Sequence, residues 1–206
     1  MRYLLAIIGA LFLLAAAGSA GSFAVEMDVD TYASSAEAEE TFADSDLLWV
    51  SSQDDDDDDD DDASGGNDAA ANETRLSYVN LFGSQGIFNP DQIKSATLTL
   101  NVARVDDEGE IKAYFLEGAT FDTLTWKDKV EYDLNVSSES IEIDEDDLES
   151  VIELDVTPII KKAVEVCTEG CPYTIVLVGE DDVSVAFVSR EASEDDMPVL
   201  EYITEE

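Results

Sequence analysis

The chain has 206 residues, which is enough for one domain with a sizeable hydrophobic core. It carries 50 acidic and 10 basic residues, a formal net charge of −40, and no histidine. A Ser-His-Asp triad, a Cys-His dyad and any zinc site with a histidine ligand are therefore excluded. The scarcity of positive charge also argues against binding to nucleic acid or to an anionic membrane surface.

The N-terminus has the three-part pattern of a secretory signal peptide. Arg2 precedes an almost wholly apolar run over residues 3–17, and small residues follow. We predict a signal peptide over residues 1–24, cleaved after Ala24, although a second small-x-small site ends at Ala20. The rival interpretation is an uncleaved anchor, but the apolar run is short for a span of about 20 residues. We expect a secreted, cell-surface-associated protein with no membrane contact after cleavage.

Short apolar runs between turn residues predict a single all-β domain over residues 25–206. Apolar and polar residues alternate most clearly from Ala96 to Ala103. The run from Tyr173 to Val178 is apolar enough for a central strand that is covered on both faces. The other expected strands begin near Met27, Leu47, Leu76, Ile111, Ile141, Val151, Val183 and Val199.

One short helix is expected after residue 156. Thr157 can cap its N-terminus, and Pro158 suits its first turn. The apolar stripe of this helix would consist of Ile159, Ile160, Ala163 and Val164.

Residues 53–72 cannot belong to a core. They include nine consecutive aspartates, Asp54 to Asp62, which repel one another. We predict an exposed, disordered loop between two strands. Simple solvation of a tolerant loop and weak, multivalent cation binding are both open interpretations of its role.

Two cysteines, Cys167 and Cys171, are separated by three residues. In an exported protein this pair predicts a small structural disulfide. A redox or metal-binding pair is disfavoured because the spacing is not that of a CxxC motif and no second ligand pair exists.

Three segments stand out along residues 25–203: Ser95-Ala96-Thr97-Leu98, Thr123-Leu124-Thr125-Trp126 and Ser189-Arg190-Glu191-Ala192. With the other expected strands in this order, they resemble the DNRLRE domain, a secreted β jelly roll. The resemblance implies a jelly-roll β-sandwich that serves as a carbohydrate-binding module or cell-surface part. A solitary, secreted, acidic domain is also similar to the cannula proteins of hyperthermophilic archaea. That likeness implies calcium-dependent assembly into extracellular tubes with strands exchanged between subunits.

Acidic turns supply the oxygen ligands that Ca²⁺ prefers, and we expect calcium as a cofactor. No EF-hand pattern is present, so no single turn is singled out. Acidity that serves only solvation or a salty environment is the alternative. The candidate ligands are Asp28, Asp30, Asp44, Asp46, Asp106, Asp107, Asp181 and Asp182, with Asp144, Asp146, Asp195 and Asp196 in further acidic turns.

Trp126 and Arg190 are the candidates for contact with a sugar. Arg190 has a structural alternative, an ion pair near the last strands. Trp49 lies in an apolar run, and we expect it in the core. Carboxylates are so abundant that no pair stands out as catalytic, and we expect no enzyme activity.

Two functional hypotheses follow. The first is a secreted structural subunit that assembles into filaments, tubules or a surface layer, with calcium neutralising and bridging the acidic subunits. Residues 25–33 would form a free N-terminal strand, with Val25, Met27, Val29 and Thr31 entering either their own sheet or that of a neighbour. The alternative is a carbohydrate-binding or adhesion module that binds an extracellular polysaccharide.

Overall fold

The computed structural model describes residues 21–25, 27–53, 73–81, 87, 89–118, 122–167, 171–193 and 195–205. The predicted leader up to residue 20 and the run of nine aspartates lie outside the described residues. In the described part of the chain, no helix has the length and apolar character needed to cross a membrane.

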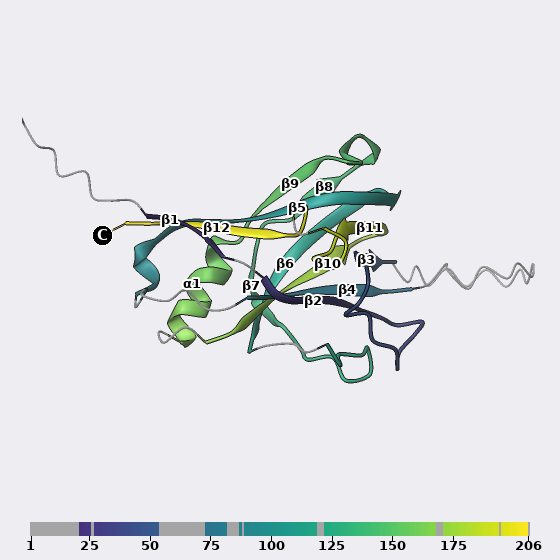
Figure 1. Cartoon of the computed structure of the whole chain (residues 1–206), viewed down its shortest axis with the longest axis horizontal. Helices are drawn as coiled ribbons and strands as arrows, with labels where there is room; N and C mark the ends of the chain where they lie inside the picture. Colours follow the sequence, from purple (N-terminus) through teal and green to yellow (C-terminus); the bar gives the residue numbers. More distant parts are fainter. Residues whose placement is uncertain are drawn as a thin grey trace, which may run out of the picture.

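The described chain is mostly β-strand, with one α-helix, which confirms the predicted all-β class (Figure 1). The described residues also include two short 3₁₀ helices. The strands are β1 (Gly21–Val25), β2 (Met27–Ser34), β3 (Leu47–Ser52), β4 (Arg75–Leu81), β5 (Ile93–Asp107), β6 (Gly109–Glu117), β7 (Asp133–Ser137), β8 (Ile141–Ile143), β9 (Val151–Asp155), β10 (Tyr173–Glu180), β11 (Val183–Val188) and β12 (Val199–Thr204), and the helices are η1 (Pro90–Gln92), η2 (Glu145–Asp147) and α1 (Thr157–Val166).

The long strand β5 joins the two halves of a curled antiparallel sheet. Its first part pairs with β12 and β9, and its last part pairs with β11. From β11 the order continues through β3, β4, β10 and β6, while β1 forms the edge beside β12. The sheet therefore folds over itself, and its inner faces meet as in a sandwich.

The main core fills the space between the two halves. Leu98 of β5 pairs with Leu154 of β9 and with Leu200 of β12, and none of the three side chains is exposed. A second, smaller apolar cluster lies on the other face of β4 and β10, around Tyr78 and Val176. Strand β10 is thus buried on both faces, as its apolar sequence predicts.

Helix α1 packs against the main core through Ile159, Ile160 and Val164, as its apolar stripe predicts. The predicted cap is wrong. Val156 occupies the N-cap position and offers no side-chain oxygen, so Asp155 Oδ1 accepts the Thr157 N–H at 2.9 Å instead. Thr157 Oγ1 is used elsewhere, since it accepts the Ala96 N–H at 2.9 Å and ties the helix to β5.

The N-terminal segment forms two strands where one was expected. β1 pairs with β12, whereas β2 pairs with β4 in the other half of the sheet. Val25 therefore lies in a different strand from Met27, Val29 and Thr31. Both strands pair within their own chain, which is the non-exchanged arrangement.

Cys167 and Cys171 form the predicted disulfide, with their Cα atoms 5.8 Å apart. The bridge follows α1 directly and precedes β10. The bridge thus links the C-terminal end of the helix to the residues just before β10.

Candidate functional site

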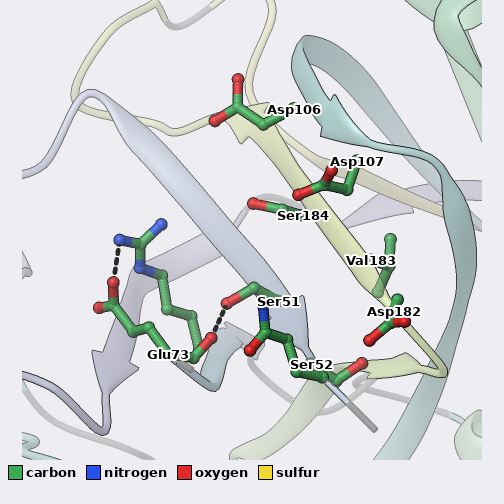
Figure 2. A pocket seen from close by; sticks show the side chains of 10 residues that line it. Ser51, Ser52, Glu73, Asp106, Asp107, Asp182, Val183 and Ser184 are labelled. Carbon is green, nitrogen blue, oxygen red and sulfur yellow. Dashed lines mark hydrogen bonds and ion pairs between the residues drawn. The ribbon is translucent and has the colours of Figure 1, made fainter. Parts of the chain in front are cut away.

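The ends of four strands surround a pocket of about 450 Å³ (Figure 2). They are the ends of β3 and β5 and the beginnings of β4 and β11. The lining is polar and largely acidic: Ser51, Ser52, Gln53, Glu73, Arg75, Asp106, Asp107, Asp182, Val183 and Ser184. Gln53 and Glu73, which both line the pocket, are the described residues on either side of residues 54–72.

The sheet face beside the pocket is set by the register of β3, β11 and β5. Ala186 pairs with Trp49 on one side and with Arg104 on the other. Because side chains two residues apart in a strand share a face, Ser51 and Ser184 lie on this same face, next to Trp49 and Ala186. We name the surface of Trp49, Ser51, Arg104, Ser184 and Ala186 the Trp49 face. Ala186 at its centre has no exposed surface, whereas Trp49 and Ser184 are half-buried.

Trp49 is not a core residue, contrary to the expectation from its apolar run. Leu48 and Val50 point into the core, so Trp49 lies on the opposite face and is half-buried. The guanidinium carbons of Arg75 and Arg104 lie 4.8 Å and 5.6 Å from the indole centroid. Alternation along β3 would have placed Trp49 on the face opposite Leu48 and Val50. Leu47, on the same face as Trp49, is also apolar, so the sequence reads as a continuous apolar run and the alternation is hidden.

Glu73 holds Arg75 in place above the indole. Its carboxylate accepts hydrogen bonds from the Arg75 guanidinium and from Ser34 Oγ. Burial raises the pKa of Glu73, but these two hydrogen bonds and the charge of Arg75 outweigh burial, and the net pKa is below its ordinary value. Glu73 therefore stays ionised, and Arg75 has a fixed anionic partner.

Trp49 is also anchored through its backbone. Its carbonyl oxygen accepts the Ser77 Oγ–H at 2.7 Å. Next along the strand, Ser51 Oγ donates to the Glu73 carbonyl oxygen at 2.6 Å. The Trp49 backbone is therefore tied to β4, and the pocket rim at Ser51 is tied to Glu73, just before β4.

The structure brings together three of the predicted calcium ligands. Asp106, Asp107 and Asp182 line the pocket, and Asp181 adjoins them in the turn between β10 and β11. Across the described ranges, however, no three Cys, Asp or Glu side chains are close enough to share a metal ion. Calcium binding stays a prediction, and the side chain of Asp28 is outside the described part.

Asp30, Asp46 and Arg190 meet at a second place, where β11 ends against β2. Asp30 Oδ2 accepts the Arg190 N–H at 2.9 Å, and the Asp46 carbonyl oxygen accepts the Ser189 N–H at 3.1 Å. Ser189 is itself buried and donates its hydroxyl to the Ser45 carbonyl oxygen at 2.5 Å. The Ser189-Arg190 segment thus forms a structural corner. The Arg190 residue is exposed, and its contact with a sugar stays a prediction, as does metal binding by exposed Asp44.

Trp126, the other predicted sugar contact, is half-buried and packs on the second apolar cluster. Lys129 Nζ lies 4.1 Å from its ring centroid. The backbone beside it is fixed, because Lys127 N–H donates to the Ala38 carbonyl oxygen at 3.0 Å. Trp126 therefore covers a core cluster and lies outside the Trp49 face.

A comparison with protein families gives one match. The family model of carbohydrate-binding module family 96 matches residues 22–204. The chain belongs to carbohydrate-binding module family 96. Membership in family 96 agrees with the jelly-roll expectation and with the carbohydrate-binding alternative, whereas nothing in it supports the likeness to cannula proteins. A search of curated proteins found no match.

Proposed function

We propose that this domain binds an extracellular polysaccharide on the Trp49 face, with the adjoining pocket supplying polar contacts. The observation that carries the proposal is the half-buried Trp49 flanked by two arginines beside an open polar pocket. Sugar sites commonly combine an apolar ring face with a few fixed polar groups. Family 96 membership independently supports a carbohydrate ligand.

Each part of the surface has a role in this proposal. The indole of Trp49, together with the Arg75 and Arg104 guanidinium groups that lie over it, provides the surface on which a sugar ring would rest. Arg75 and Arg104 donate hydrogen bonds to sugar oxygens, and the pocket's serines and carboxylates accept them from sugar hydroxyls. Because Glu73 fixes Arg75 before binding, little side-chain entropy is lost in the complex.

Replacing Trp49 tests the proposal. Trp49→Ala removes the platform, and we expect affinity for the bound polysaccharide to fall at least tenfold, the scale of loss at an aromatic hot spot. Affinity electrophoresis against soluble β-glucan, xylan, mannan and polyuronate identifies the ligand, and titration calorimetry then measures the variants.

Trp126→Ala is the matched control, because Trp126 is also half-buried but lies outside the Trp49 face. It should bind with wild-type affinity. Circular dichroism verifies that both variants are folded. Equal losses in the two variants, or unchanged binding by Trp49→Ala, would contradict the proposed site.

The proposal includes a secreted, non-catalytic role. A module that only binds needs no group poised to transfer a proton, and family 96 is a family of binding modules. Secretion follows from the predicted signal peptide and would bring the domain to the polysaccharides of a cell surface.

Calcium-dependent self-assembly is a separate proposal that rests on charge alone. Forty net negative charges oppose association unless cations neutralise them. We expect added Ca²⁺, and not an equal ionic strength of Na⁺, to raise light scattering and to produce ordered filaments in electron micrographs. A chain that remains monomeric at millimolar Ca²⁺ would exclude this role without affecting carbohydrate binding.

A further inference from the structure

The strand β1 is an integral edge of the fold. All five of its residues pair with β12, from Gly21 opposite Thr204 to Val25 opposite Leu200 (Figure 1). On β12, Leu200 and Tyr202 are buried in the core. Val25 packs against the same core cluster. β1 therefore satisfies the outer backbone groups of a strand that the core depends on.

The predicted cleavage after Ala24 conflicts with this strand. It would remove Gly21 to Ala24, which are four of the five residues paired with β12. It would also remove the beginning of the family 96 match, which starts at residue 22. The exported chain would be left with an open sheet edge along β12.

A second site avoids the conflict. Signal peptidases require small residues at the first and third positions before the cut. Gly18 and Ala20 meet this requirement as well as Ser22 and Ala24 do. The sequence alone therefore allows both sites, and the pairing of β1 distinguishes them.

We propose that the leader is removed between Ala20 and Gly21, so that the mature chain begins with β1. Water adds to the Ala20 carbonyl carbon and the peptide bond to the Gly21 nitrogen breaks. The leader leaves with a new carboxylate on Ala20, and the mature chain begins with a new amino group on Gly21. All residues of β1 then remain available to pair with β12.

The test is export of the full chain from a bacterial host that has its own signal peptidase. N-terminal sequencing and intact-mass measurement of the exported protein should both give a chain that begins at Gly21. A chain that begins at Val25, at any other residue, or at an uncleaved Met1 would overturn the proposal.

Two matched variants locate the processing site. Ala20→Gln places a bulky residue directly before the proposed cut, and we expect unprocessed precursor to accumulate. Ala24→Gln makes the same change at the rival site, and its exported chain should still begin at Gly21. Blocked processing in Ala24→Gln together with normal processing in Ala20→Gln would overturn the proposal.

Discussion

Leu98→Ala should lower the free energy of unfolding by about 2–5 kcal/mol, the range for removing a fully buried leucine side chain. Leu98 is unexposed and lies between Leu154 and Leu200 on the neighbouring strands. Its removal leaves a cavity at the junction of three strands, and these strands cannot approach each other because their backbone hydrogen bonds fix their spacing.

Urea denaturation measures this effect as a lower midpoint at an unchanged slope. Val151→Ala is the control, since Val151 lies on the adjoining strand β9 but is 56% exposed. Its free energy of unfolding should change by about 0.5 kcal/mol or less. If Leu98→Ala were no more destabilising than Val151→Ala, the described core would be incorrect.

Asp30→Ala should also destabilise the domain, by about 1–3 kcal/mol under conditions where the wild-type carboxyl is protonated. Asp30 is 3% exposed, and its Oδ2 accepts the Arg190 N–H at 2.9 Å. Removing the carboxyl leaves that N–H without its acceptor and separates the corner after β11 from β2.

The pH dependence of this contact has a definite sign. Burial is the largest influence on the Asp30 carboxyl and raises its pKa above the ordinary 3.8, although the Arg190 N–H and the Arg190 charge act in the opposite direction. The stabilisation from protonated Asp30 is thus complete below pH 3.8 and is lost as the pH rises through the folded-state pKa.

Asp30→Asn isolates this charge, because it keeps an oxygen acceptor and cannot ionise. It should match the wild type at low pH and exceed the wild-type free energy of unfolding at neutral pH. Denaturation of both proteins across this pH range measures the difference. A difference that does not change with pH would show that the Asp30 carboxyl has the same pKa in the folded and unfolded chains, which would contradict the raised folded-state pKa.

Much of the fold could be predicted from local sequence patterns. Apolar and polar residues alternate in the middle of β5, and β11 is a mostly apolar run. Both strands lie where these patterns predict them, although β5 is longer than its alternating part. β7 was missed because Asp133–Ser137 is polar and half-exposed, so its sequence has no core-facing pattern. β1 was missed because its small residues also fit the end of a leader.

The candidate site could not be assembled from the sequence. Asp106 and Asp182 share a pocket only because β5 and β11 pair, and that pairing includes two register shifts. The contact of Arg75 with Trp49 depends on how β3 meets β4. Such arrangements depend on register between distant strands, whereas a sequence pattern reports only the faces of one strand.

The most direct test of carbohydrate binding at the Trp49 face is tryptophan fluorescence. The chain has only two tryptophans, so Trp126→Phe leaves Trp49 as the sole indole, and Trp49→Phe leaves Trp126. Each variant is titrated with the polysaccharide selected by affinity electrophoresis. The account predicts a saturable change in emission from Trp49 in the Trp126→Phe variant and unchanged emission in the Trp49→Phe variant. Saturable binding with a change only from Trp126 would contradict it.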